Sequence, residues 1–219
     1  QLNVLGENLP SVEVINQFIS SIPKKFKLAQ FNFPNYLISN ESNYEIEEVF
    51  CQYLDLSQAH EELSAAYSTN AKRQIKKAIK NELKVTEAED LGFFMRLFEE
   101  AVGFKLGLLK DNYSRLYKLM NAGLHLNKGR LLSVQKGDEV LAMGYFFIQN
   151  NRITYLKGAS TLQGRDIGAM YFLMDSVINE FSSTNRVLDF GGSKVSSIAG
   201  FYKKLGGLDK TYLSFSKND

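Results

Sequence analysis

The sequence contains few of the residues that build disulfide frameworks and metal sites. It has one cysteine, Cys51, and two histidines among 219 residues. One cysteine permits no internal disulfide, and no Cys or His spacing matches a metal site, so we expect no bound metal. Cys51 lies in the apolar run VFCQYLDL, where we expect a small core residue. A reduced compartment fits this cysteine usage.

Long apolar runs and a strong charge of either sign are also missing. No run approaches the roughly 18 apolar residues of a transmembrane helix, and no signal peptide is visible, so we expect a cytoplasmic protein without a transmembrane segment. Lys and Arg number 26 against 24 Asp and Glu, and a net charge of +2 does not by itself predict nucleic-acid or membrane binding. The chain begins at Gln1 rather than Met, so we expect a trimmed or processed piece.

Apolar spacing predicts an alternation of helices and strands. Residues 11–22 have helical spacing and KFKLAQFNF alternates as a strand does, so the first fifty residues look like the end of a unit whose beginning is missing. After them come a strand, a basic helix, a short strand, two helices, three antiparallel strands, a helix, a strand, a helix and a last strand. This order predicts an α/β (α+β) fold with a mixed, mostly antiparallel sheet and helices on both faces. Strands 153–159 and 187–190 should be parallel.

The stretch ITYLKGASTLQGRDIGAMYFLMDSVINEF (153–181) reads as a strand, a glycine-containing turn and a helix. The first amides of a helix lack intrahelical partners and carry partial positive charge. Gly164 and Gly168 let the backbone approach a ligand closely, and Arg165 supplies a positive charge. The pattern therefore predicts a phosphate-binding loop. The alternative is an ordinary turn between strand and helix.

The order of motifs after residue 83 resembles the GNAT N-acetyltransferase superfamily. That family's loop has the form Gln/Arg-x-x-Gly-x-Gly/Ala, which Arg165 and Gly168 match, whereas Met170 replaces the small residue. The late helix of the family carries an aromatic–Tyr pair before a glycine turn, as Phe201 and Tyr202 do here. The resemblance implies a GNAT fold and acyl transfer.

The segments YLDLS, YSTNAKRQIKKAIKNELKV and DFGGSKVSSIAGFYKKLGG resemble the Fem-like branch of that superfamily. Its peptidoglycan ligases pass amino acids from aminoacyl-tRNA to a cell-wall precursor. The resemblance implies that residues 1–50 are a partial first GNAT-like half or extension and that residues 51–219 are the acyltransferase domain. The long coiled-coil arm of the tRNA-dependent ligases is not visible here, so the expected donor is acyl-CoA, with aminoacyl-tRNA as the alternative.

The resemblance also assigns a donor site. In the family a splayed strand holds the pantetheine arm, and its match is 154–160, which we expect to part from its neighbour at Lys157 or Gly158, with Gly158 as a candidate bulge. Tyr202 matches the tyrosine that protonates the departing thiolate; its alternative role is packing. The residues predicted to bind the donor are Lys157, Gly158, Ala159, Gln163, Gly164, Arg165, Ile167, Gly168 and Ala169.

The acceptor side is less defined by the sequence. Asp189 ends a predicted parallel strand, where ligand sites fall in open sheets, so it is a candidate catalytic base. It could equally cap the following turn. Tyr145 and Tyr155 are candidates for substrate binding. His60 and His125 have no partner spacing and are expected to be surface or hydrogen-bonded residues.

The basic helix between Lys72 and Lys80 allows two interpretations. It can contact phosphates of a tRNA, a CoA-like donor or an anionic lipid carrier, or it can be a solvated face. The function expected from the whole sequence is transfer of an acyl or aminoacyl group to an amine acceptor by direct attack in a ternary complex. The alternatives are an aminoacyl-tRNA-dependent Fem-like ligase acting on a cell-wall precursor and a non-catalytic binding module. No oligomeric state is predicted.

Overall fold

The computed structural model describes residues 11–23, 25–26, 28–34, 45–103, 109–191 and 195–218. The chain divides into two compact units. The first unit combines residues 1–51 with residues 209–219, and the second contains residues 52–208. The predicted second domain, 51–219, therefore includes a last segment that groups with the N-terminal unit.

Within its described residues, the first unit has one helix and an antiparallel pair of strands. Helix α1 (Val12–Ser20) begins at Ser11, whose hydroxyl accepts a hydrogen bond from the Val14 amide. Strand β1 (Leu28–Pro34) pairs antiparallel with β8 (Leu208–Asn218). Ile15 of α1 packs with Leu213 and Phe215 of β8. The predicted helix and strands are confirmed, whereas the origin of this unit as half of a GNAT-like pair stays a prediction.

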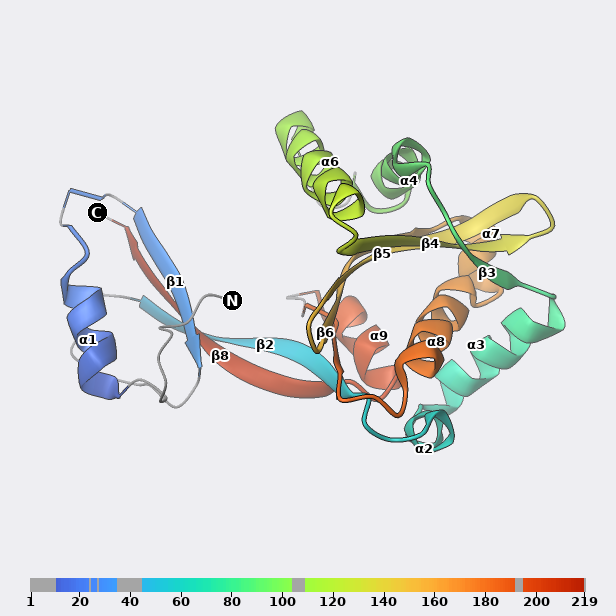
Figure 1. Ribbon diagram of the computed structural model, residues 1–219, viewed down its shortest axis with the longest axis horizontal. Coiled ribbons are helices and arrows are strands. Elements are labelled where there is room, and N and C mark those ends of the chain that lie inside the picture. Colours follow the sequence, from blue (N-terminus) through green and yellow to red (C-terminus); the bar gives the residue numbers. More distant parts are fainter. Residues whose placement is uncertain are drawn as a thin grey trace. The chain divides into compact units, whose positions relative to one another are not determined.

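The second unit is built on a mixed sheet (Figure 1). Strand β2 (Glu45–Asp55) starts in the first unit and ends in this sheet. The strand order from there is β2-β7-β6-β5-β4-β3. Neighbouring strands are antiparallel except β6 and β7, which are parallel. The predicted mostly antiparallel sheet and its one parallel pair are confirmed. The other strands are β3 (Lys84–Glu87), β4 (Gly129–Lys136), β5 (Glu139–Gln149), β6 (Arg152–Ser160) and β7 (Val187–Asp189).

Helices cover both faces of this sheet, as predicted (Figure 1). One face carries α4 (Leu91–Phe98), a π-helical turn η1 (Glu99–Gly103) and α6 (Lys110–His125). The other carries α3 (Thr69–Lys80), α8 (Ala169–Phe181) and α9 (Ser196–Lys204), with the short α2 (His60–Ala65) and α7 (Leu162–Asp166). Each face has its own apolar core, which we call the α4/α6 core and the α8/α9 core.

Gly123 lies inside a helix, although glycine commonly marks the end of one. Helix α6 continues through Gly123 to His125. A Cβ at position 123 would collide with the hydroxyl of Tyr145, which reaches across from β5 to donate to the Met120 carbonyl at 2.7 Å. The glycine therefore serves the close approach of a tyrosine and not the end of a helix.

Candidate functional site

Strands β6 and β7 part early. They pair from Arg152–Val187 to Thr154–Asp189, where β7 ends, while β6 continues to Ser160. Among the described residues, no strand pairs with this edge of β6 beyond Thr154. The parting begins before Lys157, earlier than predicted.

Asp189 explains why the strands part there. Its Oδ2 accepts a hydrogen bond from Arg152 Nη1 at 2.7 Å, and its Oδ1 accepts one from the Gly191 amide at 2.7 Å. Gly191 has φ of +79°, a backbone conformation that favours glycine, so the chain turns away from β6 at this point. Asp189 does not line the cavity described below. Its contacts match the second of its two predicted roles, the cap of the turn.

A bulge lies beside the parting. Tyr145 of β5 pairs with Lys157, and the next residue, Phe146, pairs with Tyr155, so Leu156 is the extra residue of β6. The bulge is thus at Leu156, and the prediction of a bulge at Gly158 is wrong. Gly158 has a different reason to be glycine, because a Cβ there would collide with the Tyr155 hydroxyl.

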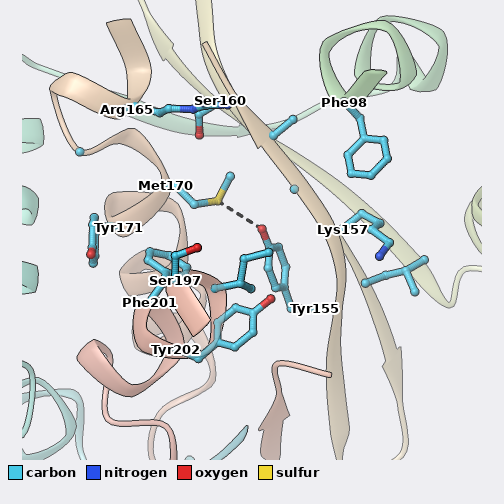
Figure 2. Close-up of a pocket in the computed structure, with 15 residues that line it drawn as sticks. Phe98, Tyr155, Lys157, Ser160, Arg165, Met170, Tyr171, Ser197, Phe201 and Tyr202 are labelled. Atoms are coloured by element: carbon cyan, nitrogen blue, oxygen red, sulfur yellow. Dashed lines mark hydrogen bonds between the residues drawn. The ribbon is translucent and has the colours of Figure 1, made fainter. Parts of the chain in front are cut away.

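A cavity of about 470 Å³ opens at the parted strands (Figure 2). This volume is within the range of small-molecule sites. Side chains from β6, α8, α9 and the end of α4 line it. The lining residues are Phe98, Tyr155, Leu156, Lys157, Gly158, Ala159, Ser160, Arg165, Gly168, Met170, Tyr171, Ser197, Ile198, Phe201 and Tyr202.

The start of α8 faces this cavity with unpaired backbone amides. Among the described residues, the amides of Ala169, Met170 and Tyr171 have no hydrogen-bond acceptor. Gly168 caps the helix with φ of +79°, and a Cβ there would lie 2.5 Å from the Gln74 carbonyl oxygen of α3. The helix starts after residue 167 because the short α7, capped by the Thr161 hydroxyl, comes between β6 and α8.

The predicted donor residues divide into two groups. Five of them line the cavity, and four do not. Gly164 is placed against the Leu141 backbone, where a Cβ would not fit. Arg165 reaches the cavity and donates from Nη2 to the Ala101 carbonyl at 2.9 Å. Those that line it are Lys157, Gly158, Ala159, Arg165 and Gly168, and those that do not are Gln163, Gly164, Ile167 and Ala169.

Tyr202 lies in the wall of the cavity (Figure 2). Its ring stacks on Phe190 with centroids 4.9 Å apart and meets Tyr155 edge-on at 6.2 Å. Burial raises the pKa of Tyr202 to about 12, so the hydroxyl keeps its proton at neutral pH. A protonated phenol at this place can donate a proton but cannot act as a base.

The two tyrosines predicted to bind substrate lie on different faces of the sheet. Tyr155 lines the cavity, and its hydroxyl donates to Met170 Sδ at 3.5 Å. Tyr145 is fully buried in the α4/α6 core and does not line it. Met170 departs from the small residue of the family motif, and its side chain fills part of the cavity beside Tyr155. Sequence reasoning gave no site role to Phe98, Leu156, Tyr171, Ser197 or Ile198.

Lys157 is the charged residue of the cavity wall on the α4 side (Figure 2). Burial lowers the pKa of its ammonium. Among the described residues no hydrogen bond or ion pair engages this group. No three His, Cys, Asp or Glu side chains in the described ranges gather in a way that would hold a metal ion.

The site and fold together match one class of protein. The chain belongs to the acetyltransferase (GNAT) domain family, whose model matches residues 65–204. This confirms the superfamily predicted from the loop and the late helix. No curated protein matches the chain. Within the described residues, no helix has the length and apolar character that crossing a membrane requires.

Solved structures share the fold at low sequence identity. FemX superposes with a TM-score of 0.65 at 15% identity, over 95% of this chain and 77% of FemX. A conserved protein of unknown function from Bacteroides thetaiotaomicron gives 0.59 at 6% identity, over 94% and 67%. L-PGS from Bacillus licheniformis gives 0.55 at 13% identity, over 95% and 73%. At these identities the likeness shows a shared fold, and membership of the Fem-like branch stays a prediction.

Proposed function

We propose that the protein transfers an acyl group from acyl-CoA to an amine by direct attack in a ternary complex. One observation carries the proposal: the free edge of β6 and the unpaired amides of α8 open into the same cavity. The edge offers backbone donors and acceptors to an extended ligand, and the pantetheine arm of CoA carries amide groups that can use them.

The phosphates of the donor suit the start of α8. Three unpaired amides and the positive end of the helix dipole favour an anion there. The Arg165 side chain, which also lines the cavity, adds a positive charge (Figure 2). Gly168 lets this turn lie close to α3, because a Cβ there would meet the Gln74 carbonyl oxygen.

The chemistry requires one proton donor that the cavity supplies. The neutral amine attacks the thioester carbonyl, the C–N bond forms, and the C–S bond breaks. The departing thiolate takes the proton of the Tyr202 hydroxyl, and the proton lost by the amine returns to Tyr202 through solvent. We assign Asp189 to holding the turn after β7 and not to deprotonating the amine, because both of its oxygens are engaged.

The basic face of α3 supports a second candidate donor, aminoacyl-tRNA, or contact with an anionic lipid carrier. Helix α3 has no acidic residue, and its cations are exposed. It packs on α8, and Lys77 Nζ donates to the Asp166 carbonyl at 2.7 Å, just before the α8 turn. A polyphosphate chain could therefore continue from the cavity onto α3, and its binding would weaken steeply with salt. The exposed cations are Lys72, Arg73, Lys76, Lys77 and Lys80.

Two measurements test the proposal. A panel of acyl-CoAs should raise the melting temperature, and no shift with any of them would remove this donor. Tyr202→Phe should lower turnover by about 10²-fold or more, as loss of a general acid does. It should leave stability nearly unchanged, because among the described residues the hydroxyl has no hydrogen-bond partner.

Tyr145→Phe is the matched control. It removes a buried hydrogen bond to the Met120 carbonyl on the far face of the sheet. It should cost about 1–3 kcal/mol of stability and leave turnover intact. If Tyr202→Phe instead lowers stability and turnover in equal measure, the tyrosine only packs, and a non-catalytic binding module becomes the better interpretation.

A further inference from the structure

The cavity joins the two faces of the sheet. Tyr155, Met170 and Tyr202 belong to the α8/α9 core, whereas Phe98 and Leu156 belong to the α4/α6 core, yet all of them line the same space. Figure 2 shows Phe98 and Lys157 on one side of β6, with Met170, Tyr171 and Tyr202 on the other. The parted strands leave the opening through which the two sides communicate.

Most of the groups that suit the donor lie on the α8 side. The α8 amides and Tyr202 are on that side of β6, and Arg165 projects from α7 to the Ala101 carbonyl of η1. A donor bound there presents its carbonyl carbon at the parting of the strands. The second substrate must then approach from the α4 side, where Lys157 and Phe98 lie.

The charged residues that line the cavity are all positive. Its lining contains two cations, Lys157 and Arg165, and no acidic residue. The undescribed internal segments of this unit, 104–108 and 192–194, also contain no Asp or Glu. A purely cationic amine acceptor would meet repulsion with no compensating carboxylate. A half-buried ammonium without a partner instead favours an anion.

We propose that the Lys157 ammonium binds a carboxylate or phosphate carried by the amine acceptor. The inference rests on the proposed function, because it takes the α8 side for the donor. Phe98 and the aliphatic stem of Lys157 form the apolar floor beside that anion. The acceptor class is therefore an amine with its own acidic group, such as an amino acid or a phosphorylated amine.

Matched pairs of amines test this inference. Alanine is compared with alaninamide, and phosphoethanolamine with ethanolamine, so each pair differs by the anionic group. Affinities are measured by titration calorimetry with and without CoA, and kcat and KM are measured with acyl-CoA. The anionic member of at least one pair should bind about 10- to 100-fold more tightly, the range of a hydrogen bond between charged groups. The pair that responds identifies carboxylate or phosphate.

Three variants assign the preference to one side chain. Lys157→Met keeps the stem and removes the charge, so it should abolish the preference by raising KM for the anionic member alone. Lys157→Arg should retain the preference. Lys136→Met, at an exposed lysine at the end of β4, is the matched control and should change nothing.

Several results would overturn the proposal. The proposal is rejected if the unmodified protein binds both members of each pair equally. It is also rejected if the protein binds neither member of either pair. A Lys157→Met variant that weakens both members equally shows a packing role. If the variant weakens succinyl-CoA relative to butyryl-CoA but spares the amine pairs, the ammonium serves the acyl group. If CoA does not bind the unmodified protein, the proposed donor is rejected. The titrations without CoA still test the preference for an anion, so the two proposals fail separately.

Discussion

Replacing Asp189 with asparagine separates its two predicted roles. The substitution keeps an oxygen that can accept from the Gly191 amide but removes the charge that faces Arg152. Arg152 is half exposed and can return to water, so losing the ion pair itself should cost about 0.2–1 kcal/mol. The weakened bond to the Gly191 amide adds a similar amount, for a total of about 1–2 kcal/mol.

The expected result for Asp189→Asn is a moderate loss of stability with turnover retained. At about 2–4 °C per kcal/mol for a chain of this size, the melting temperature should fall by roughly 2–8 °C. The kcat should fall less than tenfold, with any larger effect on KM for the donor, because the turn that opens the strands has loosened. Differential scanning calorimetry and steady-state kinetics on the same samples measure both quantities.

Arg152→Gln is the companion variant. It removes the same ion pair from the other side, so its loss of stability should resemble that of Asp189→Asn. The reasoning is refuted if Asp189→Asn lowers kcat by about 10²–10⁴ with an unchanged melting temperature, because that pattern belongs to a general base. In that case Arg152→Gln should also leave stability unchanged.

Two further predictions concern the loop and Tyr202. Gly168→Ala should lower the free energy of unfolding by about 2–4 kcal/mol, because alanine at φ of +79° is strained and its Cβ meets the Gln74 carbonyl. Thermal unfolding measures this loss, and a loss under about 1 kcal/mol would contradict the prediction. The pKa of Tyr202 rises from its ordinary value of about 10 to about 12 on folding, so the unfolded state loses its proton first as pH rises. The wild type should therefore match Tyr202→Phe in stability below pH 10 and lose stability relative to it between about pH 10 and pH 12, at about 1.4 kcal/mol per pH unit. Urea unfolding of both proteins would detect this as a difference that appears above pH 10, and equal stability of the two proteins up to pH 12 would contradict it.

Features set by neighbouring residues could be predicted from the sequence. Asp90 is a common cap residue type directly before an apolar helical run, and it caps α4, with its Oδ1 accepting from the Phe93 amide at 2.7 Å. The turns KGDE and QNNR form the β4–β5 and β5–β6 hairpins, with Gly137 and Asn150 at positive φ. These elements depend on capping and turn chemistry that a few consecutive residues carry.

Features set by distant partners could not be predicted. The parting of β6 and β7 depends on Asp189 and Arg152, which lie 37 residues apart in the chain. Glycine commonly marks the end of a helix, and the sequence around Gly123 does not reveal its partner, Tyr145, which belongs to another element. In the candidate site, the loop and Tyr202 had local motifs to reveal them, whereas Phe98 reaches the cavity from a helix on the opposite face of the sheet.

The extra residue in β6 has a consequence for how this protein could change. Tyr155 and Lys157 are two positions apart, and in a regular strand such residues share a face. Leu156 breaks that alternation, so one short segment presents a phenol to the α8 side of the sheet and an amine to the α4 side. Deleting the Leu156 codon would remove the bulge and make the tyrosine and the lysine adjacent, and adjacent residues of a regular strand still point to opposite faces. The placement of the two groups on opposite sides of the sheet could therefore survive the loss of this residue, whereas inserting or deleting a residue in the regular part of β6 would exchange the faces of the residues on one side of the change.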